Sequence, residues 1–314
     1  MIPAYSPTTL KYLTGGVPVS PILPFRSLEA HTAQLNANRG RISLSGAQSK
    51  YSVCIKDGQF VLTEAGEQGT FILKPILSDF ENARESPKNE HLTMQIAREV
   101  FHIETAPNAL CYFENGDPAY ITRRYDIAAD GTRIQQEDFA ALAGISADTH
   151  GRDYKYTALS YEEIGQLIKR FLPAWRVEMV KFFDLILFNF LFSNGDAHLK
   201  NFSVLMTPEG DYRLAPAYDL IDTHIHLPDD SIFALRKGLF ADGRTFPSGI
   251  GNKDFHEFGL RLGLPEKVVA KELDRFCDDY PAIESMVQAS TLSGKVKRDY
   301  YEHYHIRLVA FLRA

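Results

Sequence analysis

Hydrophobic and polar positions alternate in short runs over roughly the first 125 residues, a pattern typical of β-strands. The runs that predict strands are RISLSG, YSVCIKDGQFVLT, GTFILKPI and NALCYFENGDPAYITRRY. Two of these runs contain a turn dipeptide, Asp57-Gly58 in one and Asn115-Gly116 in the other, so each is expected to form a hairpin. The sequence therefore predicts a β-rich first part.

A single helical pattern, ESPKNEHLTMQIAREVF, interrupts these strands. Ser86 is of a residue type that caps helices and is predicted to cap this one. Glu90 is spaced along the helix so that it shares one face with Met94, Ala97 and Phe101. An acidic residue in line with an apolar stripe needs a partner if that face is buried.

From about residue 135 the pattern changes to helices. LSYEEIGQLIKRFLP has an apolar stripe, and AWRVEMVKFFDLILFNFLF is apolar around most of its circumference, which predicts a central buried helix. FSVLMTPEGDYRLAP predicts a hairpin, and the chain becomes helical again from about Lys253. We expect an α+β, bilobal fold, with a β-rich lobe that has one key helix (residues 1–125) and a mostly α-helical lobe (residues 126–314).

Composition narrows the class of protein. A hydrophobic fraction of 45% and a charged fraction of 24% are those of an ordinary globular protein, and the net charge of −6 argues against a general nucleic-acid binder. Cys54, Cys111 and Cys277 are far apart and show no CxxC spacing. The start lacks a secretory pattern, and the longest apolar run, Phe182–Phe192, is too short to span a bilayer. We expect a cytoplasmic protein that binds neither membranes nor nucleic acid directly.

The segment SNGDAHLKNFSV follows the apolar helix and concentrates polar side chains. Asp196 and Asn201 are five residues apart, the separation of the Asp and Asn in the catalytic loop of protein kinases. Lys200 could neutralise charge on a transferring phosphoryl group, and His198 is expected to orient the loop. Because Asn-Gly and Gly-Asp are also turn dipeptides, an ordinary turn is the alternative.

Two further positions fit phosphoryl transfer. Lys74 ends the apolar run TFILK, and pairing with Glu90 would explain both a buried Lys and a buried Glu; a surface Lys and a capping Glu are the alternative. Asp219 stands eighteen residues after Asn201, where a kinase places a metal-binding Asp, although no Phe-Gly follows it. Asp222 is interpreted as a helix cap or loop residue.

Two other motifs carry weaker signals. SGAQSK, from Ser45 to Lys50, could cover phosphates because Gly46 lets the backbone come close, but it lacks P-loop spacing and an ordinary hairpin turn is the alternative. His224 and His226 alternate in THIHLP, as metal ligands on a strand can. No third ligand is suitably spaced, so we interpret them as loop residues.

In this order, RISLSGAQSK, TFILKP, NEHLTMQIA, NGDAHLKNFSV and LAPAYDLI resemble the motifs of HipA-like serine/threonine kinases, the toxins of bacterial toxin–antitoxin systems. The resemblance runs from about residue 41 to the C-terminal helices. It implies a bilobal, protein-kinase-like fold that uses ATP and Mg²⁺. It also implies that Asp196 is the catalytic residue, with His198 and Lys200 beside it in the loop, and that Asn201 and Asp219 are metal ligands.

The resemblance further implies a set of nucleotide-binding residues. Its members are Ser45, Gly46, Ala47, Gln48, Ser49, Lys50, Lys74, Glu90, Arg123, Arg124, Tyr125 and Tyr218. Lys74 would contact the phosphates, the segment from Ser45 to Lys50 would cover the nucleotide, and Arg123 to Tyr125 would meet the adenine. Ser43 and Ser45 are the implied autophosphorylation sites, and the added negative charge would switch the kinase off.

The resemblance also suggests partners. The resemblance begins after the N-terminal subdomain of full-length HipA proteins, so we expect a short HipT-type kinase, in which a small separate HipS-like protein supplies that part. A HipB-like DNA-binding antitoxin and an aminoacyl-tRNA synthetase substrate are expected, with arrest of translation as the outcome. Two alternatives stay open: a small-molecule phosphotransferase of the aminoglycoside or choline kinase kind, and a catalytically silent nucleotide-binding or partner-binding module.

Overall fold

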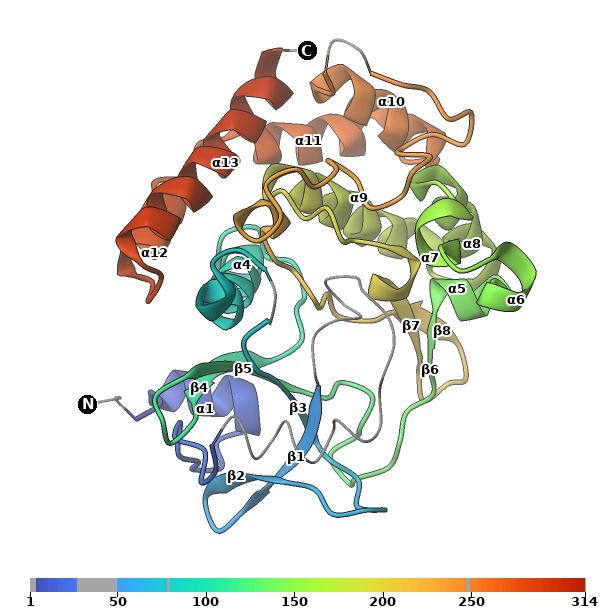
Figure 1. Ribbon diagram of the computed structural model, residues 1–314. Helices are drawn as coiled ribbons and strands as arrows, with labels where there is room; N and C mark the ends of the chain where they lie inside the picture. Colours follow the sequence, from blue (N-terminus) through green and yellow to red (C-terminus); the bar gives the residue numbers. More distant parts are fainter. Residues whose placement is uncertain (1–3, 27–49, 78–79, 247–248, 314) are drawn as a thin grey trace.

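The structure is a computed structural model, and it describes residues 4–26, 50–77, 80–246 and 249–313. Within these ranges a five-stranded antiparallel sheet lies against a larger group of helices, with a second, three-stranded sheet beside them (Figure 1). Ser43, Ser45 and the segment from Gly46 to Ser49 lie outside the described residues. Among the helices that the structure describes, none is long and apolar enough to cross a membrane.

The larger sheet is built from two hairpins with β3 between them. Its strand order is β2-β1-β3-β5-β4, from β1 (Tyr51–Lys56), β2 (Gln59–Leu62), β3 (Phe71–Lys74), β4 (Asn108–Tyr112) and β5 (Pro118–Arg123). Asp57 and Gly58 join β1 to β2 with φ of 51° and 73°, the left-handed conformations that a tight hairpin turn requires. Both predicted hairpins are confirmed, and pairing of β3 with β5 places Lys74 opposite Tyr120.

Helices cover both faces of this sheet. Neighbouring residues of β5 point to opposite faces: Ile121 packs in the cluster that contains Leu13 of α1 (Pro7–Thr14), whereas Tyr120 packs in the cluster that contains Met94 of α4 (Ser86–Glu99). The sheet is therefore a middle layer between α1 and α4. Figure 1 shows α4 between this sheet and the remaining helices.

The sequence pattern did not predict α1, although it carries the expected end signals. Ser6 caps the helix by accepting a hydrogen bond from the Thr9 amide at 3.1 Å, Pro7 is its first residue, and Gly15 ends it with φ of 72°. Only Leu13 is buried in these eight residues, so the helix offers no apolar stripe to detect.

The predicted stripe on α4 is confirmed, and the predicted cap is wrong. Glu90, Met94, Ala97 and Phe101 are all buried. Ser86 is the first helical residue and does not cap the helix. Its hydroxyl instead accepts from the Leu77 amide at 3.0 Å and donates to the Ala83 carbonyl at 2.9 Å, which ties α4 to the chain before it and to η1 (Ala83–Glu85).

The helical part surrounds α9 (Trp175–Leu191), which is buried along most of its length, as predicted. The other elements are β6 (Gln136–Asp138), α5 (Phe139–Leu142), α6 (Ala147–His150), α7 (Tyr154–Thr157), α8 (Tyr161–Phe171), η2 (Leu199–Asn201), β7 (Ser203–Met206), β8 (Tyr212–Leu214), η3 (Thr223–Ile225), α10 (Asn252–Arg261), α11 (Glu266–Cys277), α12 (Pro281–Ala289) and α13 (Gly294–Arg313). The β7–β8 hairpin is confirmed, and β6 joins it as a strand that the sequence did not predict.

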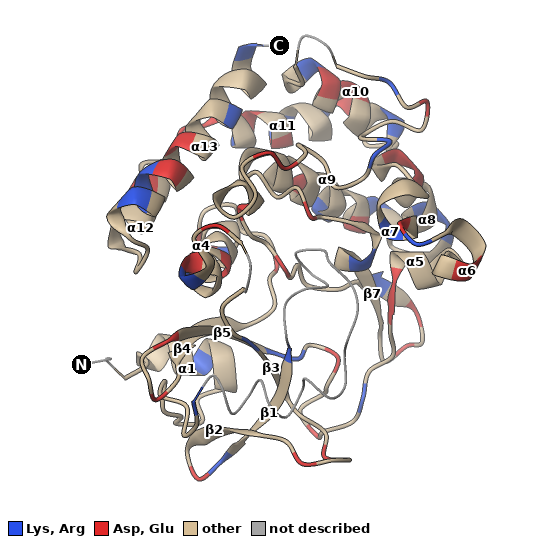
Figure 2. Ribbon diagram, viewed as in Figure 1, with Lys and Arg blue, Asp and Glu red and all other residues tan. Residues whose placement is uncertain are grey.

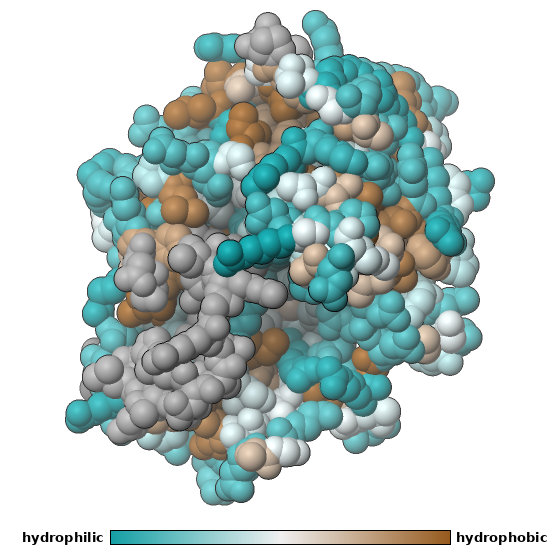
Figure 3. Space-filling model, turned by 45° about the vertical axis from the view of Figure 1, so that its right-hand side comes forward, coloured by the Kyte–Doolittle hydropathy of each residue, from teal (hydrophilic) through white to brown (hydrophobic). Residues whose placement is uncertain are grey.

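Charged and hydrophobic residues are mixed over the parts of the molecule that the figures show. Figure 2 shows basic and acidic residues interspersed along α10 to α13. On the face that Figure 3 shows, hydrophobic residues of the described part form separate groups among hydrophilic ones. The α+β expectation is confirmed. The domain boundary after residue 125 stays a prediction; β5 of the larger sheet ends just before it, at Arg123.

Candidate active site

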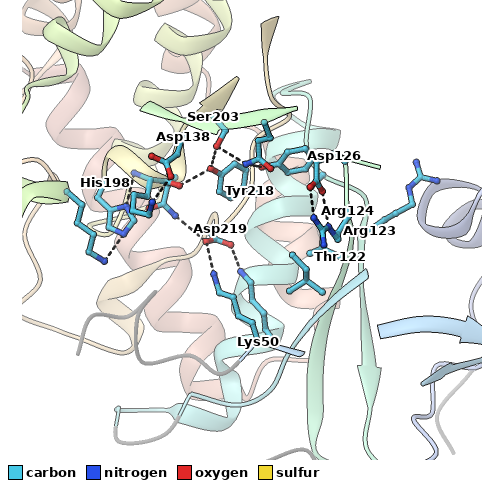
Figure 4. A pocket seen from close by; sticks show the side chains of 18 of the residues that line it. Lys50, Thr122, Arg123, Arg124, Asp126, Asp138, His198, Ser203, Tyr218 and Asp219 are labelled. Carbon is cyan, nitrogen blue, oxygen red and sulfur yellow. Dashed lines mark hydrogen bonds and ion pairs between the residues drawn. The ribbon is translucent and has the colours of Figure 1, made fainter. Parts of the chain in front are cut away.

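A cavity of about 640 Å³ opens between the larger sheet and the helical part. Its size is typical of a small-molecule site. Several of the residues predicted from the sequence line it: Lys50, Lys74, Arg123, Arg124, Tyr125, His198, Lys200, Asn201, Tyr218 and Asp219. Figure 4 shows Lys50 reaching Asp219 from one side of this cavity, with Tyr218 and Ser203 on the other.

Lys74 and Glu90 form the buried pair that the sequence predicts. The Lys74 ammonium lies 2.5 Å from Glu90 Oε1, and the two residues are only 3% and 2% exposed. Lys74 also contacts the Asp219 carboxylate, so the end of β3, one face of α4 and the loop after β8 meet at one ammonium group. A second ammonium, that of Lys50, lies 3.6 Å from Asp219 Oδ2.

Burial and the neighbouring charges shift the pKa of the two acids in opposite directions. Burial raises the pKa of Glu90 to about 7, against the attraction of Lys74. Burial would also raise the pKa of Asp219, but the Lys50 and Lys74 ammonium groups hold it below its ordinary value. Asp219 is therefore ionised at neutral pH, as a metal-binding carboxylate has to be.

Asn201 and Asp219 are brought together as the sequence predicts, in a geometry that suits a cation. Asn201 Nδ2 donates to Asp219 Oδ2 at 3.2 Å, whereas Asn201 Oδ1 is buried and has no hydrogen-bond partner among the described residues. Asp219 adopts φ of 56°, a strained conformation for a non-glycine residue and one often found at functional sites. An amide oxygen beside a carboxylate is the donor set that Mg²⁺ prefers, so these residues fit the metal.

The segment before Asn201 is a turn that is stabilised by one internal hydrogen bond and by hydrogen bonds to α9 and η3. Asn194 donates to Asn189 Oδ1 of α9 at 2.9 Å, and its own side-chain oxygen accepts from the Asp196 amide at 3.3 Å. The Gly195 amide donates to Thr223 Oγ1 at 3.0 Å. A Cβ atom on Gly195 would collide with the Asp230 carboxylate and the Ser231 carbonyl, so only glycine fits here. The turn and loop interpretations of this segment are therefore compatible.

His198 and Lys200 face residues that the sequence analysis did not consider. Lys200 Nζ lies 2.5 Å from the Asp138 carboxylate, so its predicted action on a phosphoryl group stays a prediction. His198 Nε2 lies 3.0 Å from Lys155 Nζ, and its ring packs edge-on against Tyr156. Burial, together with the Lys155 ammonium, lowers the pKa of His198 to about 3. A neutral, packed imidazole suits the orienting role expected for it.

The segment predicted to meet the adenine, Arg123 to Tyr125, lines the end of the cavity away from His198 (Figure 4). The Arg124 amide donates to the Thr70 carbonyl at 2.9 Å, and its side chain forms a two-bonded ion pair with Asp126. The Tyr125 ring packs against Tyr218, with ring centroids 5.6 Å apart. Two aromatic rings beside an apolar strand form a surface on which a base can stack.

The other candidates have structural roles. Asp222 caps η3, as predicted, by accepting from the His224 amide at 3.0 Å, and it pairs with His303 Nδ1 at 2.8 Å. His226 lies between the Glu81 carbonyl, 2.9 Å from Nδ1, and Asn89 Nδ2, 3.1 Å from Nε2.

The Asp222–His303 pair gives a pH-dependent contribution to stability. Burial lowers the pKa of His303, but Asp222 outweighs this and raises it overall. A raised histidine pKa contributes stability fully below about pH 6.5, and the contribution is lost as pH rises through the folded-state pKa. We expect His303→Gln to lower the free energy of unfolding by about 1 to 3 kcal/mol at pH 6 and by clearly less at pH 9. Urea titrations of both proteins at the two pH values measure this. A cost that is constant or larger at pH 9 contradicts it.

Comparison with known proteins places the chain in a family. The model of the HipA-like C-terminal domain matches residues 42–288, and the chain belongs to this family.

Solved structures agree on the fold. The chain superimposes with a TM-score of 0.67 and 23% identity on a chain of the "Shewanella oneidensis MR-1 Toxin Antitoxin System HipA, HipB and its operator DNA complex", covering 90% of this chain and 70% of that one. The proinflammatory kinase CtkA of Helicobacter pylori gives a TM-score of 0.53 at 13% identity, covering 83% and 87%. The predicted kinase-like fold is thus confirmed.

Curated relatives are also kinases by name. The chain is 34% identical over 235 residues to "Putative kinase Y4mE" of Sinorhizobium fredii, covering 73% of this chain and 52% of that protein. It is 29% identical to a "Putative kinase" of Haemophilus influenzae, covering 86% and 81%. It is 26% identical to the "Serine/threonine-protein kinase toxin HipA" of Shewanella oneidensis, covering 86% and 63%. The match therefore spans about half to four-fifths of these relatives.

Proposed function

We propose that this protein is an ATP- and Mg²⁺-dependent serine/threonine protein kinase. The observation that carries the proposal is the meeting of Lys74, Glu90 and Asp219 at one ammonium group, with Lys74 and Asp219 lining the cavity and Asn201 hydrogen-bonded to Asp219. These are the residue types, on the expected elements, that phosphoryl transfer from ATP requires. The kinase names of the relatives support the same class of reaction.

Each residue would have a defined task. Lys74, held by Glu90, would bind phosphate oxygens, while the surface formed by Tyr125 and Tyr218 would accept the base. Asn201 and Asp219 would hold Mg²⁺, which when bound neutralises charge on the phosphates. Asp196 would orient the acceptor hydroxyl and receive its proton. As the hydroxyl oxygen forms its bond to the γ-phosphorus, the bond from phosphorus to the β-phosphate oxygen breaks and ADP leaves with that electron pair.

The identity of the protein substrate and the partners are also proposals. We propose an aminoacyl-tRNA synthetase as substrate, and a HipB-like antitoxin and a small HipS-like protein as partners of a toxin of the HipT type. The HipA chain that shares this fold was solved with HipB and operator DNA, which supports an antitoxin partner of that kind.

We further propose that Ser43 and Ser45 are autophosphorylated and that this inhibits the kinase. A phosphate adds about −1.5 to −2 charges, which would compete with the nucleotide phosphates for the Lys50 and Lys74 ammonium groups. Intact-mass analysis after incubation with Mg²⁺ and ATP should show added phosphate that a Ser43→Ala, Ser45→Ala double variant lacks. Equal phosphate on both proteins contradicts the assignment.

The decisive experiment is transfer of γ-labelled phosphate from ATP into proteins of a cell lysate. Wild type should label a protein band, and Asp196→Asn should lower the labelling rate by roughly a hundredfold to ten-thousandfold, as loss of a general base does. Asp211→Asn is the matched control, because Asp211 is exposed in the β7–β8 turn; it should match wild type. Equal labelling by Asp196→Asn, or transfer only to aminoglycosides or choline, contradicts the proposal.

A further inference from the structure

The one-turn helix α7 lies against the segment that carries Asp196. The Tyr156 hydroxyl donates a hydrogen bond to Asp196 Oδ1 at 2.8 Å, across forty positions of sequence. The next residue back, Lys155, lies 3.0 Å from His198, two residues beyond Asp196. Both Lys155 and Tyr156 also line the cavity. Two consecutive side chains of α7 therefore contact two alternate side chains of the catalytic segment.

Contacts with Arg236 fix the position of α7. The Arg236 amide donates to the Tyr156 carbonyl at 2.9 Å, and the Arg236 guanidinium pairs with Asp153 at 3.1 Å. The Tyr156 ring packs edge-on against the His198 ring, with centroids 5.1 Å apart. A tyrosine has only two side-chain torsions, so a packed ring on a fixed backbone places its hydroxyl with little freedom.

We propose that Tyr156 is a positioning residue for phosphoryl transfer, which holds the Asp196 carboxylate in the orientation that receives the proton of the acceptor hydroxyl. The inference rests on the proposed kinase function. Proton transfer needs donor and acceptor within hydrogen-bond reach, and a carboxylate that rotates freely reaches that geometry only part of the time. A hydrogen bond from outside the catalytic loop removes this freedom. The hydroxyl proton passes to Asp196 as the oxygen–phosphorus bond forms and the bond to the ADP oxygen breaks.

Lys155 strengthens the same arrangement. The His198 ring is held at both nitrogens: Nε2 lies 3.0 Å from the Lys155 ammonium, and Nδ1 lies 3.3 Å from the Lys200 amide nitrogen. Lys155 thus helps to fix the rotation of the His198 ring. The part of the loop between Asp196 and His198 is held at both ends by α7, and a shift of α7 would move the carboxylate with it.

The test is Tyr156→Phe, which keeps the ring and removes only the hydroxyl. We expect kcat to fall by about tenfold to a hundredfold, as loss of an outer hydrogen bond to a reacting group does, with KM for ATP unchanged within twofold. Tyr212→Phe is the matched control: it also removes a tyrosine hydroxyl hydrogen bond, 3.1 Å to Glu137, and does not line the cavity. It should leave both constants unchanged.

The outcomes separate the inference from the proposed function. If wild type transfers phosphate and Tyr156→Phe keeps kcat within twofold, the positioning role is wrong although the kinase proposal stands. A fall in kcat accompanied by an equal rise in KM for ATP, or by a lower melting temperature that accounts for the loss, assigns Tyr156 a merely structural role and also overturns the inference. Absence of any transfer by wild type refutes the kinase proposal first.

Discussion

Asp219→Asn should abolish Mg²⁺-dependent ATP binding and lower phosphoryl transfer by roughly a thousandfold or more. The substitution keeps the shape of the side chain and removes the charge that a divalent cation needs beside the Asn201 oxygen. The fold should survive, because Glu90 lies 2.5 Å from the buried Lys74 ammonium. Removing the Asp219 charge, which raises the pKa of Glu90, favours the ionised form that pairs with Lys74. Isothermal titration with ATP, in Mg²⁺ and in EDTA, measures the effect.

Wild type should bind ATP more tightly in Mg²⁺ than in EDTA, and Asp219→Asn should show the same weak affinity in both. Asp148→Asn is a suitable control, since Asp148 is exposed on α6 and should keep the wild-type response to Mg²⁺. If Asp219→Asn retains that response, Asp219 is not the metal ligand and the metal site has to be placed elsewhere.

Gly195→Ala should also have a large effect, although it adds only one methyl group. The added Cβ would collide with the Asp230 carboxylate and the Ser231 carbonyl, and the latter is backbone that cannot rotate away. Either the 230–231 segment or the segment that carries Asp196 has to shift. We expect a loss of about 1 to 3 kcal/mol in free energy of unfolding and a fall in kcat of about a hundredfold.

Gly294→Ala provides the control for this change. Gly294 is the first residue of α13, and a Cβ atom there would have nothing within 4 Å. This variant should be neutral or slightly more stable, because alanine has less conformational freedom in the unfolded chain. Urea unfolding and initial rates on both variants separate the two cases. Wild-type kinetics for Gly195→Ala would mean that the segment tolerates displacement.

The parts of the site that the sequence predicts are those that depend on short-range spacing along the chain. Glu90 could be assigned to the buried face of α4 because helical spacing puts it in line with Met94 and Phe101. A buried acid then calls for a base, and Lys74 at the end of an apolar strand was the available one. Asn201 and Asp219 were placed by a loop spacing and by the short hairpin between them, and the structure has them 3.2 Å apart.

The parts that the sequence could not predict depend on contacts between distant, very short elements. Tyr156 and Asp138 lie in or beside helices of four residues, too short to show an apolar stripe, and each meets its partner only through the packing of the helical part. The polar and aromatic run GRDYKYT does not indicate which residues it contacts. Ser86 was misassigned because a hydroxyl at a helix start has several backbone partners in reach, and in this chain Leu77 and Ala83 are the ones it bonds.

The burial of α4 bears on how the proposed kinase activity could be regulated. In protein kinases the helix that carries the Lys-pairing Glu is a point of control, because its position decides whether the ion pair forms. Here that helix shares a continuous apolar core with α9 through Met94 and Phe101, and Thr93 bonds the Tyr300 hydroxyl of α13 at 2.9 Å. Swinging it outward would open this core to water. Under the proposed kinase function, a chain built this way would be assembled for catalysis once folded, and its restraint would come from whatever covers the cavity or binds beside it.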